Sequence, residues 1–169
     1  MTITFILGGA RSGKSTHALH LGEGCEGARI FIATAEALDA EMTDRIERHR
    51  TERKDHWKTI EEPLNLAAAI SEHAISGNTV LIDCLTLWLS NLFHHERDSD
   101  QEILLLADSL ERATGNIILV SNEIGLGLVP ETSLGRSFRD AQGRLNQKIA
   151  AMSDIVEFIA AGIPLKLKG

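Results

Sequence analysis

The stretch from Gly8 to Ser15 constrains the fold of this chain more than any other part of the sequence. It matches the phosphate-loop pattern, in which a glycine is followed by four residues and then by Gly-Lys-Ser or Gly-Lys-Thr. An apolar run, Thr2 to Leu7, precedes it, and a helical pattern, Ser15 to Leu21, follows. Strand, glycine loop and helix in this order bring backbone N–H groups and a helix N-terminus to one point, which attracts a polyphosphate. The sequence therefore predicts a nucleotide-binding loop.

The residues of this loop have expected parts in holding a nucleoside triphosphate. Lys14 would reach the outer phosphates as a point charge, and the Ser15 hydroxyl would bind the Mg²⁺ that bridges them. The alternative is a glycine-rich turn that carries a lysine by chance. Because the flanking patterns are those of a strand and a helix, we expect nucleotide contacts from the whole loop: Gly8, Gly9, Ala10, Arg11, Ser12, Gly13, Lys14 and Ser15.

Short runs rich in Ile, Val and Leu recur along the chain and alternate with helical patterns. This alternation predicts an α/β fold, with a mostly parallel sheet and helices on both faces. The 169 residues suit one domain, residues 1–169, and no linker divides them. The predicted strands are Ile3 to Leu7, Ile30 to Ala33, Val80 to Asp83, Ile117 to Ser121 and Ile155 to Ala160, and covering helices are predicted at Asn65 to Ser76 and Gln101 to Thr114.

Polar residues follow several of the predicted strands, and ligands of open parallel sheets bind beyond the carboxyl ends of strands. Asp83 ends an apolar run and has the form of the acidic partner of a phosphate loop, which holds Mg²⁺ directly or through water. The alternative is a helix cap, and one carboxylate can serve both roles. Two more strand ends carry polar groups: Ala33-Thr34-Ala35-Glu36 and Asn122-Glu123-Ile124-Gly125.

A second chemical signal lies on the helix predicted from Asp39 to Lys54. From Arg45 to Lys58, six basic residues stand against three acidic ones, in a chain whose net charge is −7. A local concentration of arginine suits phosphate groups. His49 lies on or beside the apolar stripe of this helix, where it is either a structural residue or a nucleophile that attacks phosphorus.

Composition excludes several other classes of protein. The net charge of −7 argues against a general nucleic-acid binder, and no apolar stretch is long enough to span a membrane. Cys25 and Cys84 are too few and too far apart for a disulfide framework or a zinc site, so reduced thiols are expected. The first apolar run lacks a basic leader and continues directly into the phosphate loop. These features predict a soluble cytoplasmic protein.

Near the C-terminus, the segment from Phe138 to Lys148 has many polar residues on one predicted helix, and much of it fits a solvated face. Gly143 is harder to explain in this way, because a glycine in the middle of a helix costs roughly 1 kcal/mol relative to alanine. It suggests the close approach of another chain or of a ligand.

Taken together, these segments resemble the bifunctional adenosylcobinamide kinase and adenosylcobinamide-phosphate guanylyltransferase family of cobalamin synthesis. The resemblance runs nearly from end to end. The motifs that carry it are Gly8 to Ser15, Ile32 to Ala35, Asp39 to Met42 with Arg45, Ile46 and His49, His56-Trp57, Asp83 to Thr86, Asn122 to Glu131, Phe138 to Asp140, Gly143-Arg144 and Asn146-Gln147.

The resemblance implies two reactions. ATP or GTP phosphorylates the hydroxyl of adenosylcobinamide, and GTP then transfers GMP to that phosphate, which gives adenosylcobinamide-GDP and pyrophosphate. His49 matches the histidine that carries the guanylyl group. Further guanine-nucleotide contacts map onto Ala33, Thr34, Ala35, Arg50, Thr51, Glu52, Arg53, Glu61 and Asp83. The resemblance also implies a RecA-like P-loop fold and a homotrimer.

Two other functions fit the same residues. A monofunctional P-loop kinase of another small hydroxyl substrate would use the phosphate loop and leave His49 structural. A nucleotide-binding module without phosphoryl transfer would bind GTP and form no product, although a candidate nucleophile on a basic helix counts against it.

Overall fold

A computed structural model describes residues 1–36 and 56–169 of the chain. The helix predicted from Asp39 to Lys54 lies outside the described residues, as do His49, Arg50, Thr51, Glu52 and Arg53.

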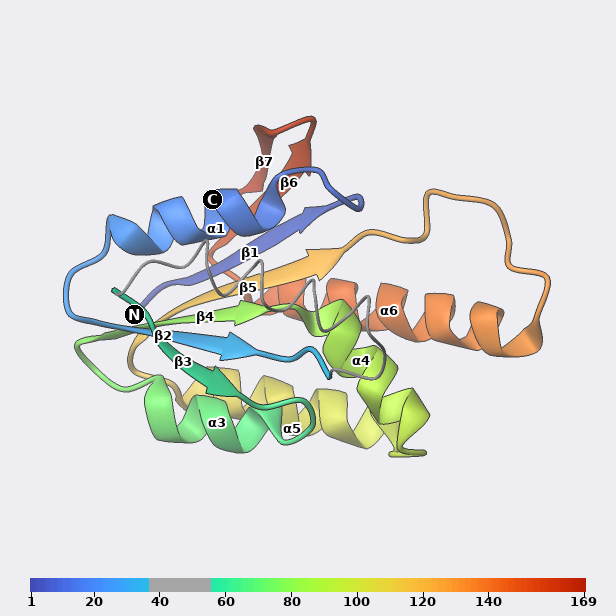
Figure 1. Cartoon of the computed structure of the whole chain (residues 1–169), viewed down its shortest axis with the longest axis horizontal. Coiled ribbons are helices and arrows are strands. Elements are labelled where there is room, and N and C mark those ends of the chain that lie inside the picture. Colours follow the sequence, from blue (N-terminus) through green and yellow to red (C-terminus); the bar gives the residue numbers. More distant parts are fainter. Residues whose placement is uncertain (37–55) are drawn as a thin grey trace.

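The described residues form a seven-stranded sheet with the order β3-β2-β4-β5-β1-β6-β7 (Figure 1). The strands are β1 (Ile3–Gly8), β2 (Ala28–Ala33), β3 (Lys58–Glu61), β4 (Asn78–Asp83), β5 (Asn116–Asn122), β6 (Ile155–Ala160) and β7 (Ile163–Lys168). The helices are α1 (Lys14–Glu23), α3 (Leu66–His73), α4 (Leu85–His94), α5 (Ser99–Arg112) and α6 (Ser133–Met152). Neighbouring strands pair in parallel, except for the antiparallel pair β6 and β7. The predicted α/β fold with a mostly parallel sheet is confirmed.

Helices cover both faces of the sheet, as the sequence predicts. Helix α1 lies on one face, where Ala18 packs with Ile6 and Val120 in one apolar cluster. Helices α3, α4, α5 and α6 lie on the other face, over a second and larger cluster (Figure 1). The central strands are apolar on both sides because both sides are covered.

Because side chains alternate between the two faces of a sheet, the face of each residue at a strand end follows from its neighbours in the strand. Leu81 of β4 and Val120 of β5 belong to the cluster under α1. Side chains two residues apart share a face, so Asp83 and Asn122 continue on the α1 side at the carboxyl edge. Strand β5 lies between β1 and β4. The end of β5 therefore lies between the phosphate loop and Asp83.

Two glycines within helices are predicted to respond oppositely to alanine. A Cβ at Gly22 of α1 would lie 2.5 Å from the ring of Trp57, which is buried and meets Phe31 edge to face with ring centres 6.3 Å apart. A Cβ at Gly143 of α6 would have no described atom within 4 Å. We expect Gly22→Ala to destabilise the fold by about 1–3 kcal/mol through overpacking.

Gly143→Ala should stabilise the fold by roughly 0.5–1 kcal/mol. Urea unfolding measures both.

The outcome at Gly143 also tests the contact expected there. The described part of the chain places nothing close to this glycine, so the expected approach of another chain or a ligand stays a prediction. Loss of stability in Gly143→Ala, at a protein concentration where copies assemble, would place a neighbouring chain at this position.

Candidate nucleotide site

The phosphate loop leaves β1 at Gly8 and enters α1 at Lys14. Gly13 caps the helix with a φ of 96°, a left-handed conformation that favours glycine. A Cβ at Gly8 would lie 2.5 Å from the carbonyl oxygen of Ile159, so the backbones of β1 and β6 approach too closely for a larger residue. The local conformation thus requires glycine at both positions.

The N-terminus of α1 is arranged to receive an anion. Its capping residue makes no side-chain hydrogen bond to the helix, and its first turn holds no acidic residue. The first N–H groups of a helix need acceptors, and an uncapped helix end carries a partial positive charge. A phosphate at this point would supply the acceptors.

The turn between β6 and β7 supports the loop from outside. The N–H of Gly162 donates to the carbonyl of Ser12 at 2.8 Å. A Cβ at Gly13 would lie 3.2 Å from Cα of Gly162, so the two backbones are in contact. Strand β7 was not predicted from the sequence, and neither was this support. The signal was present in Ala161-Gly162, a pair suited to a tight hairpin turn between two apolar runs.

Lys14 is the first residue of α1, and its side chain is buried within the loop. Its exposed fraction is 7%, and Nζ donates to the carbonyl of Gly9 at 2.6 Å. Burial and the charge of Asp83 raise the pKa of the Cys84 thiol, and the charge of Lys14 lowers it. Lys14 follows β1 and Asp83 ends β4, so both lie at the carboxyl edge of the sheet with one strand, β5, between their strands.

Asp83 ends β4 and lies in register with Ala33, which in turn lies in register with Glu61 at the end of β3. The helix that follows has Cys84 as its N-cap and makes no side-chain cap hydrogen bond. The alternative role of Asp83 as a helix cap is therefore absent from the described structure. Its carboxylate lies on the α1 side, where the phosphate loop is.

Thr34 directly follows β2 and is hydrogen-bonded to the backbone directly after β4. Its hydroxyl donates to the carbonyl of Cys84 and accepts from the N–H of Cys84, both at 2.8 Å. Asn91 of α4 donates to the Thr34 carbonyl at 2.7 Å. The side chain of Thr34 is fully buried and holds the backbone beside Asp83. Nucleotide contact by Thr34 and its neighbours Ala33 and Ala35 stays a prediction.

Cys84 is predicted to be an unreactive thiol. Burial, and then the neighbouring Asp83 carboxylate, raise its pKa to about 12. At pH 8, below that value, the thiol stays protonated, and the thiolate is the reactive form. We expect iodoacetamide to modify Cys84 about 100-fold more slowly than the half-buried Cys25 in the native protein. Mass spectrometry of the digested protein measures both rates, with urea-unfolded protein as the control. Equal native rates would contradict the prediction.

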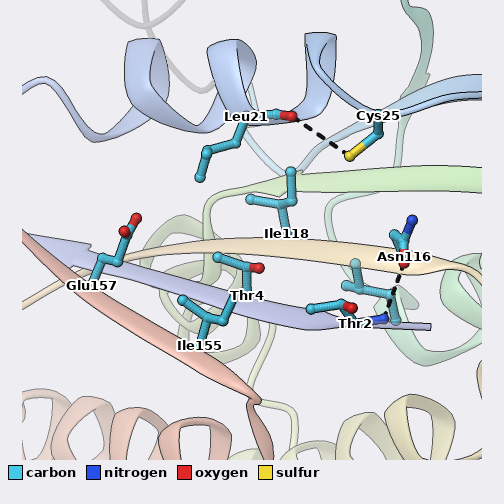
Figure 2. A pocket seen from close by; sticks show the side chains of 9 residues that line it. Thr2, Thr4, Leu21, Cys25, Asn116, Ile118, Ile155 and Glu157 are labelled. Atoms are coloured by element: carbon cyan, nitrogen blue, oxygen red, sulfur yellow. Dashed lines mark hydrogen bonds between the residues drawn. The ribbon is translucent and has the colours of Figure 1, made fainter. Parts of the chain in front are cut away.

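A cavity of about 260 Å³ lies at the opposite end of the sheet (Figure 2). Its lining includes Thr2 just before β1, Asn116 at the start of β5 and Cys25 just beyond α1. Glu157 at its border pairs with His17 of α1, with a distance of 2.6 Å between Oε2 and Nε2. This cavity is separate from the strand ends that carry the phosphate loop and Asp83.

The phosphate loop with Lys14 and Ser15, and Asp83 at the end of β4, lie at the carboxyl edge of the sheet. Ala33 and Glu61 end the next strands along this edge, β2 and β3. A glycine loop before an uncapped helix, with a lysine and an acidic strand end nearby, defines a nucleotide-binding protein of the P-loop class.

Comparison with known proteins places the chain more closely. The family model described as "Cobinamide kinase / cobinamide phosphate guanyltransferase" matches residues 4–167, and the chain belongs to this family. A similar protein is the bifunctional adenosylcobalamin biosynthesis protein CobP of Pseudomonas aeruginosa, with 49% identity over 97% of this chain and 96% of the relative. The bifunctional adenosylcobalamin biosynthesis protein CobU of Escherichia coli is 38% identical over 96% of this chain and 98% of the relative.

Among solved structures, the chain is similar to one whose title describes an ATPase domain, with a TM-score of 0.48 and 13% identity. The match covers 93% of this chain and 68% of that one. None of the helices in the described ranges is long and apolar enough to cross a membrane.

Proposed function

We propose that this chain phosphorylates adenosylcobinamide with ATP or GTP and then transfers GMP from GTP to the product. The observation that carries the proposal is the family match over residues 4–167. The phosphate loop supports it, because Gly13 has a left-handed conformation and Lys14 Nζ lies within the loop. The named activities of the family are a cobinamide kinase and a cobinamide phosphate guanyltransferase.

In the kinase step, the substrate hydroxyl oxygen bonds to the γ-phosphorus, and its proton passes to water. The bond between the γ-phosphorus and the bridging oxygen breaks, and its electron pair leaves with the nucleoside diphosphate. The loop N–H groups and Lys14 stabilise the charge on the transferred group.

In the guanylyl step, a nitrogen of His49 bonds to the α-phosphorus of GTP, and pyrophosphate leaves. A phosphate oxygen of the corrinoid then attacks the same phosphorus and releases His49. Two displacements through imidazole replace one more difficult transfer. Arg50, Thr51, Glu52, Arg53 and Glu61 complete the proposed guanine-nucleotide contacts, with Ala33, Thr34, Ala35 and Asp83 on the neighbouring strand ends.

The oxygen donors at the site suit Mg²⁺, which binds to one or two protein oxygens and takes its other ligands from phosphates and water. Ser15 would hold it through its hydroxyl and Asp83 through its carboxylate. When bound, the ion neutralises charge on the phosphates. Within residues 1–36 and 56–169, no cluster of three or more His, Cys, Asp or Glu side chains offers a separate metal site.

The proposal includes one catalytic domain over residues 1–169, a homotrimeric assembly and a cytoplasmic location. The homotrimer is supported by resemblance to the family, and the location by two cysteines that suit reduced thiols in a reducing compartment. No nucleic-acid partner is proposed for an acidic chain of this charge.

The test is a two-stage reaction with purified protein, adenosylcobinamide and Mg²⁺. With ATP alone, we expect adenosylcobinamide phosphate, and after addition of GTP we expect adenosylcobinamide-GDP and pyrophosphate, both detected by mass spectrometry. Product that stops at the phosphate would support the monofunctional kinase instead. Tight GTP binding without any corrinoid product would support a non-catalytic module.

A further inference from the structure

Behind the carboxyl edge of the sheet, a buried group of polar side chains joins β5, α4 and α6. Ser121 Oγ donates to Asn146 Oδ1 at 2.8 Å, and Gln142 Nε2 donates to Ser121 Oγ at 2.9 Å and to Asn146 Oδ1 at 3.0 Å. Thr86 of α4 lies beside them, with 3.4 Å between its hydroxyl and that of Ser121. Gln142 and Ser121 are fully buried. Burying several polar groups is costly unless they are hydrogen-bonded, so this group has a specific structural use.

That use is to hold the backbone of Asn122. The N–H of Asn122 donates to Thr86 Oγ1 at 2.8 Å, and its carbonyl accepts from Asn146 Nδ2 at 3.1 Å. The next N–H, that of Glu123, donates to the carbonyl of Gly8 at 3.1 Å. Asn122 also lies in register with Gly8, the first glycine of the phosphate loop. Both backbone groups of one residue are thus fixed beside the loop by side chains from two helices.

The side chain of Asn122 is half-buried and lies on the α1 side of the sheet, the side that also carries Asp83. Its strand is the one between β1 and β4. In the proposed site, Lys14 would reach the outer phosphates from the side of β1, and Asp83 would approach them from the side of β4. Asn122 therefore lies on the strand between the two that carry the groups proposed to hold the outer end of a triphosphate.

We propose that the Asn122 side chain contacts the terminal phosphate of the bound nucleotide, and that Thr86, Asn146 and Gln142 are the positioning residues that hold it there. The inference rests on the proposed kinase function. The Asn122 amide would donate a hydrogen bond to a phosphate oxygen and exchange no proton. During transfer, the acceptor oxygen bonds to the γ-phosphorus, its proton passes to water, and the bridging bond breaks with its electron pair on the diphosphate. A donor fixed in advance stabilises the charge that develops in this step.

The first test compares Asn122→Ala with the wild type and with Asn116→Ala, a control at the other end of the same strand. We expect Asn122→Ala to lower kcat for adenosylcobinamide phosphorylation about 100-fold, because loss of one positioned donor has an effect of this size. Asn116→Ala should keep the wild-type kcat. An unchanged kcat in Asn122→Ala, with an active wild type, would overturn the inference and leave the proposed function intact.

A second measurement does not depend on the corrinoid. Binding of ADP and of a non-hydrolysable ATP analogue is measured by calorimetry for the same three proteins. The ratio of the Kd for ADP to the Kd for the ATP analogue measures the preference for the triphosphate. Asn122→Ala should lower this ratio about 10-fold, an effect of the size expected for one hydrogen bond to a charged group. If the wild type does not phosphorylate adenosylcobinamide, this ratio still decides the inference. An unchanged ratio would overturn it.

The positioning residues are tested with a matched pair at Thr86. Thr86→Val keeps the shape but removes the acceptor for the N–H of Asn122, and Thr86→Ser keeps that acceptor. We expect Thr86→Val to lower kcat about 10-fold while KM for ATP changes little, and Thr86→Ser to restore most of the rate. Equal rates in folded Thr86→Val and Thr86→Ser would overturn the positioning role. Circular dichroism and thermal unfolding establish that each variant is folded.

Discussion

Lys14→Met is expected to lower the rate of both reactions by about 100- to 1,000-fold, because it removes a fixed positive charge from the phosphates. Methionine is unbranched and apolar, so it replaces the stem of the buried lysine and leaves its packing largely intact. The ammonium donates to the Gly9 carbonyl at 2.6 Å in the described structure, and bound phosphates would compete for it. Rates with saturating nucleotide separate the loss in kcat from the loss in affinity.

The matched control for this variant is Lys148→Met, which removes an exposed lysine from α6. It changes net charge by the same amount and lies outside the proposed site, so wild-type rates are expected. Thermal unfolding of Lys14→Met should resemble that of the wild type. A Lys14→Met protein that keeps more than about a tenth of the wild-type kcat would contradict a role of this charge in transfer.

Patterns within short segments predicted most of the fold. The runs that became β1, β2, β4, β5 and β6 are rich in Ile, Val and Leu, and each is predicted to within two residues at either end. Strand β7 was missed because it is an exposed edge strand with Pro164 and two lysines, and a proline weakens a strand prediction. Strand β3 has only four residues, too few to show a period.

The candidate site likewise has one part that the sequence predicts and one part that it does not. The glycines of the phosphate loop are predicted from their spacing between an apolar run and a helical pattern, because both signals lie within one short segment. The buried polar group around Asn122 was not predicted, since Ser121 and Asn146 are 25 residues apart and meet through packing. On α6, the sequence favours a solvated helix face for Gln142 and Asn146, and the structure instead buries both side chains. A pattern of polar residues does not distinguish amides that face water from amides that bond to one another in the interior.

His49→Ala is expected to abolish a covalent label and with it the second reaction. Wild-type protein incubated with GTP labelled at the α-phosphate and Mg²⁺ should acquire a label that is acid-labile and base-stable, as a phosphoramidate is. His49→Ala should carry no such label and should lose at least about 1,000-fold in guanylyl transfer, since the nucleophile itself is gone. The kinase step should continue, because it uses the phosphate loop and needs no imidazole.

His56→Ala is the matched control, because it removes an exposed histidine seven residues later in the same basic region. It should label like the wild type. A label that survives in His49→Ala, or that depends on His56, would place the nucleophile elsewhere. Absence of label in an active wild type would argue for direct transfer, in which the phosphate loop presents the α-phosphorus of GTP to the corrinoid phosphate itself.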